Sequence, residues 1–246
     1  MRRWYHYLME HLLEEIQLYF SDSSRCLALT GSGGKTTSMI LLARHYAEEG
    51  KRVLVSTTTK LQLPKEREYG CDTYFLNDTV LSHHPAQGER VFYSHLAHKA
   101  VAPPLEHLQA LLDRYDVMLL EADGAMNLGL KIHEERDPVV PSFVTGTLAI
   151  VSMGLLGKPF KENCLGSERY PLEFAEKRVC LDTYRKLLAH KQGILKRARG
   201  KSLILCNQSR FEDIEEYRKL SGSSSFSRPI WFGDMQTNHL IYRNEP

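Results

Sequence analysis

Apolar residues fall into two kinds of segment along this chain, and together they predict strands and helices in alternation. Short apolar runs typical of buried strands occur at 26–30, 52–56, 115–120, 147–152, 202–206 and 229–232. Segments with the length or spacing of helices occur at 38–48, 103–114 and 172–190. Strands that alternate with helices form parallel sheets covered by helices. The pattern therefore predicts an α/β fold with a mainly parallel sheet flanked by helices.

The N-terminal segment predicts an amphipathic helix of its own. Residues 4–20 repeat apolar side chains at helical spacing, namely Tyr5, Leu8, Leu12, Ile16 and Tyr19. The polar face of this helix is acidic rather than basic. That charge favours packing against the rest of the protein over a membrane surface or a partner.

Two regions are patterned more weakly. Residues 72–76 and 89–93 predict short strands that could pair as an edge hairpin, within the weakly patterned region 61–100. This region also holds four histidines whose spacing matches no metal-binding motif, namely His83, His84, His95 and His98. We expect them to be solvated loop residues. Residues 125–141 predict a long polar loop.

Composition narrows the functional classes. The 32 basic residues nearly balance the 30 acidic ones, which argues against a nucleic-acid-binding surface. The 5 cysteines are odd in number and form no C-x-x-C pair, which favours a reduced cytoplasm. No apolar stretch reaches the ~18 residues of a membrane span. Acidic residues interrupt the N-terminal apolar run, so we expect no signal peptide.

Candidate chemistry centres on a glycine-rich loop between the first predicted strand and the helix at 38–48. The loop reads Gly31-Ser32-Gly33-Gly34-Lys35-Thr36-Thr37. Its glycines permit positive φ, so successive backbone N–H groups can converge on an anion at the helix N-terminus. Lys35 would bring a positive charge to the terminal phosphates, and the Thr36 hydroxyl would bind Mg²⁺. The loop therefore predicts a nucleoside triphosphate site.

The loop departs from the standard Walker A motif, which requires glycine at the position of Leu29. With Thr30 in front, its spacing resembles the shortened loop of the Mur-ligase ATP sites. It is also similar to the glycine-rich loops of ParA-type and nitrogenase-iron-protein-type ATPases. These resemblances imply a P-loop NTPase-like fold.

An acidic pair follows the strand at 115–120, in the position of a Walker B element. Glu121 and Asp123 are two residues apart, so an extended chain directs both to one side. Mg²⁺ prefers oxygen ligands, and one or two carboxylates suffice. The strand at 52–56 also ends in hydroxyl residues, at the edge where parallel sheets bind ligands. The predicted metal ligands are Thr36, Thr57, Thr58, Glu121 and Asp123.

Other basic residues are weaker candidates. Lys131 and His133 are expected to alternate outward from the loop at 125–141, where they could reach a transferred group. Lys35, Asp123 and Lys131 form the predicted catalytic set. Two further groups are expected on solvated surfaces, namely Arg169 and the basic cluster of Lys191, Lys196, Arg197, Arg199 and Lys201.

The end of the strand at 202–206 offers contacts for a nucleotide base. Asn207 and Gln208 follow this strand, and several P-loop families use an asparagine there to bind the base. A guanine-binding motif would place aspartate where Arg210 stands. Guanine specificity is therefore not supported, and the expected nucleotide is ATP or GTP, with ATP favoured.

Together these motifs resemble the selenium-dependent hydroxylase accessory proteins, a family also called YqeC-like. The resemblance covers the chain from about 25 to 210, and it is carried by the glycine loop 31–37, Thr57–Lys60, Glu121–Gly124, Lys131, 137–141, Gly157–Pro159 and Asn207-Gln208. The chain departs from the family pattern in region 61–100 and at Ser167-Glu168. The resemblance implies a role in maturing selenium-dependent molybdenum hydroxylases, with such an enzyme or its cofactor-maturation proteins as partners.

The sequence thus predicts an N-terminal helix at 1–24 and a P-loop nucleotide-binding domain at 25–246 with inserted loops. The leading hypothesis is a Mg²⁺-dependent NTPase that acts as a maturation factor. Two alternatives remain open at this point. One is a small-molecule kinase or Mur-like ligase that activates an acceptor, and the other is a nucleotide-binding module without catalysis.

Overall fold

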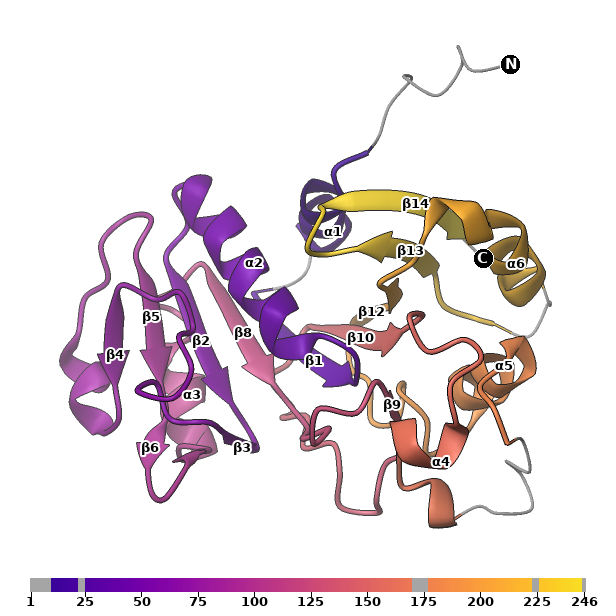
Figure 1. Cartoon of the computed structure of the whole chain (residues 1–246). Coiled ribbons are helices and arrows are strands. Elements are labelled where there is room, and N and C mark those ends of the chain that lie inside the picture. Colours follow the sequence, from indigo (N-terminus) through magenta and orange to yellow (C-terminus); the bar gives the residue numbers. More distant parts are fainter. Residues whose placement is uncertain (1–9, 22–24, 170–176, 223–225, 245–246) are drawn as a thin grey trace.

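A nine-stranded sheet forms the centre of the protein. The computed structural model describes residues 10–21, 25–169, 177–222 and 226–244. The strand order is β14-β13-β12-β10-β1-β8-β2-β5-β4. Neighbouring strands are parallel except for β13 and β14, which are antiparallel at one edge (Figure 1). The predicted α/β fold with a mainly parallel sheet is confirmed.

The strands of this sheet are β1 (Cys26–Gly31), β2 (Val53–Thr57), β4 (Thr73–Phe75), β5 (Arg90–Tyr93), β8 (Val117–Glu121), β10 (Gly146–Ser152), β12 (Lys201–Asn207), β13 (Ile230–Asp234) and β14 (His239–Asn244). Two small sheets pair β3 (Lys60–Leu61), β7 (Ala100–Val101) and β6 (His95–Leu96), and β11 (Cys164–Leu165) with β9 (Leu130–Lys131). The α-helices are α1 (Leu12–Phe20), α2 (Lys35–Glu48), α3 (Leu105–Leu111), α4 (Phe160–Asn163), α5 (Leu181–Ala189) and α6 (Ile214–Ser221). The 3₁₀ helices are η1 (Asp78–Ser82), η2 (Ser167–Arg169) and η3 (Phe211–Asp213).

Helices cover both faces of the sheet because successive strand residues point to opposite sides. On β1, Leu27 and Leu29 pack in one cluster with side chains of α1 and α2. Cys26 and Ala28 pack on the other face with side chains of α3. Further along that second face, β10 and β12 are covered by α5 and α6. The strand that precedes the glycine-rich loop therefore lies in the middle of the core.

The N-terminal helix packs against the domain, as its acidic face suggested. Leu12, Ile16 and Phe20 of α1 are buried among residues of α2 and the sheet. Residues 4–9 of the expected N-terminal helix lie outside the described part of the chain. The same is true of residues 172–176, the start of the helical segment expected at 172–190, within which α5 lies. Among the described residues, no helix has the length and hydropathy needed to cross a membrane.

The expectation that segments 72–76 and 89–93 pair as an edge hairpin is wrong. Strands β4 and β5 occupy these segments, but they pair in parallel. The helix η1 and a turn carry the chain back between them, which is the crossover that parallel neighbours need. At the opposite edge, β14 adds an antiparallel strand that the sequence pattern did not predict.

The segment 125–141 is more ordered than the expected polar loop. Its strand β9 pairs in parallel with β11. Leu130 and Ile132 are buried in the core cluster that also contains Phe160. Lys131 and His133 are buried as well, so the expectation that they point outward is wrong. Their apolar neighbours hold this segment against the domain, and the two polar side chains face inward.

Candidate functional site

The glycine-rich loop leaves the carboxyl end of β1, next to the ends of β8 and β10. Gly31, Gly33 and Gly34 have φ angles of 90°, 91° and 121°, which favour glycine. A Cβ on Gly33 would lie 2.4 Å from the backbone nitrogen of Ser152. The loop thus depends on glycine both for its path and for its close approach to β10. Helix α2 begins at Lys35, so residues 35–37 of the predicted loop form its first turn.

A cleft of about 1000 Å³ opens beside this loop. It is lined by residues of the loop, of the carboxyl ends of several strands, and of the segments around β3 and β7. They include Gly33, Gly34, Lys35, Thr36, Thr37, Thr58, Lys60, Arg67, Tyr69, Lys99, Glu121, Ser152 and Gln208. The carboxyl edge of a parallel sheet is the usual place for a ligand in such folds.

Glu121 and Thr36 form a direct contact at this cleft. The Thr36 hydroxyl donates a hydrogen bond to Glu121 Oε2 at 2.7 Å. The Thr57 hydroxyl donates to the backbone oxygen of Glu121 at 2.9 Å, which fixes the end of β8 against β2. Burial raises the pKa of the Glu121 carboxyl, although Lys35 and the Thr36 hydroxyl oppose the rise. An oxygen pair of this kind can bind Mg²⁺.

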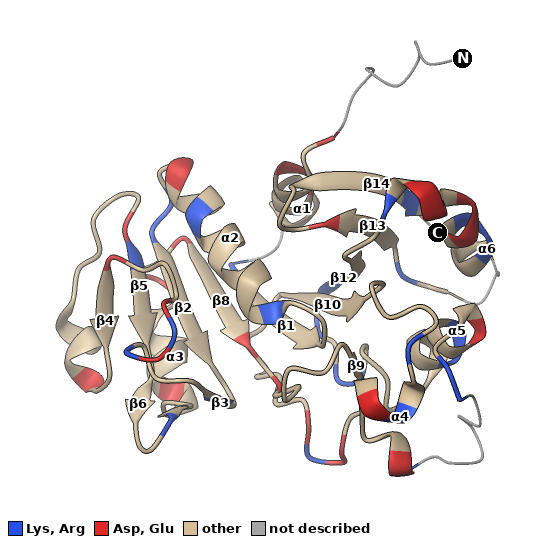
Figure 2. Ribbon diagram, viewed as in Figure 1, with Lys and Arg blue, Asp and Glu red and all other residues tan. Residues whose placement is uncertain are grey.

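Lys35 turns back toward the acidic end of β8. Its ammonium donates to the backbone oxygen of Gly31 at 2.7 Å, and it lies 2.9 Å from Asp123 and 3.9 Å from Glu121. Figure 2 shows the basic start of α2 beside the acidic end of β8. The loop and the acidic residues that the sequence singled out are therefore brought together.

Asp123 is the hub of a buried polar cluster. It accepts hydrogen bonds from the Gly31 amide at 2.8 Å and from His133 Nε2 at 2.5 Å, and Lys131 Nζ lies 3.6 Å away. Its side chain is fully buried. Burial alone would raise the pKa of Asp123, but Lys35, His133 and Lys131 outweigh it and hold that pKa well below its ordinary value. Asp123 ties the glycine loop to the rest of the cluster.

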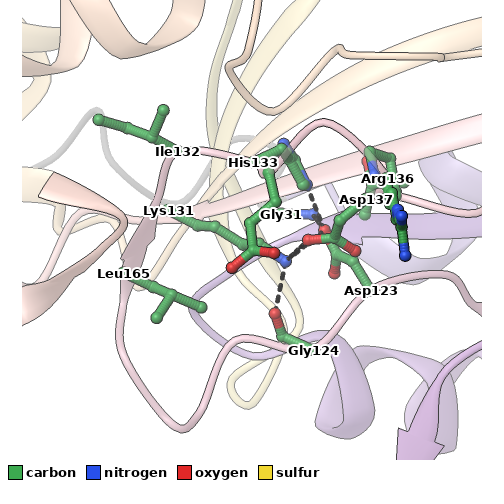
Figure 3. Close-up of polar contacts among 12 residues, drawn as sticks. Gly31, Asp123, Gly124, Lys131, Ile132, His133, Arg136, Asp137 and Leu165 are labelled. Carbon is green, nitrogen blue, oxygen red and sulfur yellow. Dashed lines mark hydrogen bonds and ion pairs between the residues drawn. The ribbon is translucent and has the colours of Figure 1, made fainter. Parts of the chain in front are cut away.

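The two basic residues of β9 and its extension complete this cluster. Lys131 Nζ donates to the backbone oxygen of Gly124 at 2.5 Å and forms an ion pair with Asp137 (Figure 3). His133 Nδ1 faces the backbone oxygen of Gly193 at 2.8 Å. These contacts lie within the protein rather than at the cleft surface.

The side chain of Asn207 is engaged by the protein itself. Its amide nitrogen donates to the backbone oxygen of Gly33 at 2.9 Å, and its oxygen accepts from the Met235 amide at 3.0 Å. Asn207 thus braces the glycine loop against the C-terminal strands. Gln208, with a φ of 59°, lines the cleft instead. The Thr58 hydroxyl likewise donates to the backbone, at Val139 O, 2.6 Å away.

Three of the remaining basic candidates contact the segment at 134–138. Arg169 pairs with Glu134 and Glu168 at the surface. Lys196 and Arg197 donate to backbone oxygens between Glu134 and Pro138. They therefore brace the chain beside Asp137 and Lys131.

Two basic residues of the cleft, Arg67 and Lys99, were not singled out from the sequence, and a third, Lys60, was named only as the end of the Thr57–Lys60 stretch, with no role assigned. Lys60, Arg67 and Lys99 line the side of the cleft formed by β3, β7 and the chain between β3 and β4. Lys60 follows the hydroxyl residues at the end of β2, which is a signal that could have found it. Arg67 and Lys99 lie in the weakly patterned region, where no local motif marks them.

Comparisons with known proteins agree on one family. A family model described as YqeC protein matches residues 27–168. A curated Escherichia coli (strain K12) protein, described as uncharacterized protein YqeC, is 29% identical over 138 residues, which are 53% of this chain and 53% of that protein. The match thus spans about half the length of that relative. No solved structure matches this chain. The family match includes both the glycine loop and the acidic end of β8.

Proposed function

The chain belongs to the YqeC protein family, and we propose that its cleft binds a nucleoside triphosphate together with Mg²⁺ in a P-loop NTPase-like site. The observation that carries this proposal is the Thr36–Glu121 contact of 2.7 Å directly after a glycine loop that ends in Lys35. A hydroxyl, a carboxylate and a lysine at a helix N-terminus are the groups that a metal-bound triphosphate needs.

The loop and α2 supply the phosphate contacts. Gly33 and Gly34 line the cleft with Lys35 and Thr36. The N-terminus of a helix carries a partial positive charge of roughly +0.5, which favours an anion at this place. Lys35 would add a full charge when its ammonium moves from Asp123 toward the terminal phosphates. Catalysis in such a site consists of positioning and charge neutralisation.

The metal would lie between Thr36 and Glu121. Both oxygens are at the cleft, whereas Asp123 is fully buried and already accepts two hydrogen bonds. Within the predicted ligand set, we therefore assign Glu121 and Thr36 to direct contact with Mg²⁺. Asp123 positions the loop, and Thr57 and Thr58 fix neighbouring strand ends through their backbone contacts.

Nucleotide titration tests this function. Calorimetry with the full chain should detect ATP binding that is strengthened by Mg²⁺ and is tighter than GTP binding. Thr36→Val keeps the shape of the side chain and removes its hydroxyl, so it should remove most of the Mg²⁺ enhancement. The absence of binding by both nucleotides, with and without Mg²⁺, would overturn the proposal.

The Mg²⁺ enhancement should also depend on pH through Glu121. Because burial raises the pKa of this carboxyl, it becomes protonated at a pH above the ordinary glutamate value of about 4.3. A protonated carboxyl cannot bind Mg²⁺ well. As the pH is lowered, the Mg²⁺ enhancement should therefore begin to fade before the pH reaches the ordinary glutamate pKa. Titrations across pH should show this loss in the wild type. Glu121→Gln should show little enhancement at any pH.

The family resemblance supports a role for this activity in maturing selenium-dependent molybdenum hydroxylases. In that role, nucleotide binding or hydrolysis would drive the handling of a partner enzyme or its cofactor. Nucleotide turnover by the purified chain, increased by such a partner, would support it. Tight nucleotide binding without turnover, both with and without the partner, would favour a nucleotide-binding module that does not catalyse a reaction.

A second candidate function is transfer to an anionic acceptor, as in a kinase or ligase. Lys60, Arg67 and Lys99 favour it, because they add positive charge to the cleft beyond the glycine loop. Turnover that requires a metabolite extract would support this function. Substitution of Arg67 by alanine should then reduce the turnover that the extract stimulates and leave nucleotide affinity nearly unchanged.

A further inference from the structure

A cluster of metal-binding side chains lies outside the cleft, near the β4–β5 edge of the sheet. Asp78 begins η1, His95 belongs to β6 and His107 lies in the first turn of α3. The carboxylate Oδ1 of Asp78 is 2.6 Å from His95 Nε2 and 3.0 Å from His107 Nδ1. The three potential ligand atoms lie within 4.8 Å of one another.

The Tyr93 hydroxyl completes this cluster from β5. Its oxygen lies 2.8 Å from Asp78 Oδ1, 3.3 Å from His95 Nε2 and 3.2 Å from His107 Nδ1. Tyr93 is buried in the core, with its ring packed in the same hydrophobic cluster as α3. One oxygen is thus held close to all three potential ligands.

These separations are close to those of a tetrahedral zinc site. Ligands about 2.0–2.1 Å from a tetrahedral Zn²⁺ lie about 3.3–3.4 Å apart. The two carboxylate–imidazole separations, 2.6 Å and 3.0 Å, are shorter than this, as hydrogen bonds require, and side-chain rotations would open them. Two imidazoles and one carboxylate also match the nitrogen and oxygen ligands that Zn²⁺ binds.

We propose that Asp78, His95 and His107 bind a divalent transition-metal ion, with Zn²⁺ the best match. Three protein ligands leave a fourth position, next to the Tyr93 hydroxyl, for water or another small ligand. This hydroxyl donates its hydrogen bond to Asp78 and orients the carboxylate.

The metal would link three elements that are separate in the sequence, namely η1, β6 and α3. His95 faces Val101 in the β6–β7 pairing, and Val101 in turn pairs with Lys60 of β3. Lys60 and Val101 line the central cleft. A metal ion at this edge would therefore fix the small sheet that forms one side of the cleft. The site itself contains none of the residues assigned to nucleotide binding, and it stands or falls separately from the proposed function.

Metal titration of the full chain tests this site. The protein is treated with a chelator, dialysed, and titrated with Zn²⁺ by calorimetry and with Co²⁺ by visible absorption. We expect one tightly bound equivalent, with the intense d–d bands of a four- or five-coordinate Co²⁺ site. His95→Ala and His107→Ala should each weaken binding by more than the 10–100-fold that loss of an outer-shell partner causes.

Matched controls separate this cluster from other histidines and from the central site. His84 and His98 are exposed residues of the same region and lie outside the cluster, so His84→Ala and His98→Ala should bind metal like the wild type. Asp78→Asn keeps the side-chain shape and serves as a second ligand variant should an alanine variant fail to fold. Unchanged Co²⁺ bands in folded His95→Ala and Asp78→Asn, or no binding by the wild type, would overturn the proposal.

Discussion

Replacing Lys35 with alanine is expected to reduce nucleotide affinity by about 100- to 1000-fold. A charge pair about 4 Å apart in an effective dielectric near 20 is worth about 4 kcal/mol, which is close to three factors of ten in affinity. Part of this gain is offset because the ammonium must leave Asp123, 2.9 Å away. Calorimetric titration with ATP and Mg²⁺ measures the change.

The design must separate lost binding from lost structure. In the Lys35→Ala variant, Asp123 keeps its contacts with Gly31, His133 and Lys131, so we expect the fold to persist. Urea unfolding checks this point. Lys51→Ala is the matched control, because it removes an exposed lysine just beyond the opposite end of α2 and alters the net charge equally. A folded Lys35→Ala variant that binds ATP as tightly as Lys51→Ala does would refute the assigned role.

Local sequence signals predicted which residues meet at the centre of the candidate site. The glycine loop, Lys35 and Glu121 could be identified because each motif lies within a few residues of a strong apolar strand. Parallel neighbours then bring the carboxyl ends of β1 and β8 together, so contact between Thr36 and Glu121 follows from the topology. For these residues, the strand pattern and the loop composition contain most of the necessary information.

The inward orientation of Lys131 and His133 was harder to predict. Leu130 and Ile132 alternate with them, and this apolar alternation indicates a strand even within a polar segment. The alternation does not show that a buried carboxylate faces the polar side of this strand. Only the fold reveals that Asp123 lies where both basic side chains can reach it.

The candidate metal site illustrates a different limit. Sequence spacing groups His95 with His98 and His83 with His84, whereas the fold groups His95 with His107 and Asp78. These three residues come from a strand, a helix and a 3₁₀ helix that meet only in the folded chain. Ligand motifs are visible in a sequence when one element carries several ligands, and here each element carries one.

The second large effect is expected for Asp123→Asn, which should lower the free energy of unfolding by about 3–5 kcal/mol. Removal of one partner from a buried ion pair leaves the opposite charge uncompensated, and this loss typically has that size. Here Lys35 and Lys131 both have almost completely buried side chains and face Asp123. The asparagine keeps the shape of the side chain but not its charge. Urea unfolding near neutral pH measures the difference.

Asp116→Asn provides the matched control, since Asp116 forms a 2.8 Å ion pair with Arg52 and the hydrogen bond from Arg52 lowers the pKa of Asp116 to about 2. Both side chains of that pair are more than one third accessible to water, so its loss should cost only about 0–1 kcal/mol. An Asp123→Asn loss no larger than this would contradict the hub role.

The pH dependence of the free energy of unfolding tests the same prediction independently. An aspartate whose pKa is lowered by folding stabilises the folded state above its unfolded pKa of about 3.9, and this contribution disappears as the pH falls through the folded-state value. The stability difference between wild type and Asp123→Asn should therefore be constant near neutral pH and shrink below about pH 4. If the difference instead grew with acidity, the carboxylate would not be the stabilising species, and the buried cluster would have to be held together by its hydrogen bonds alone.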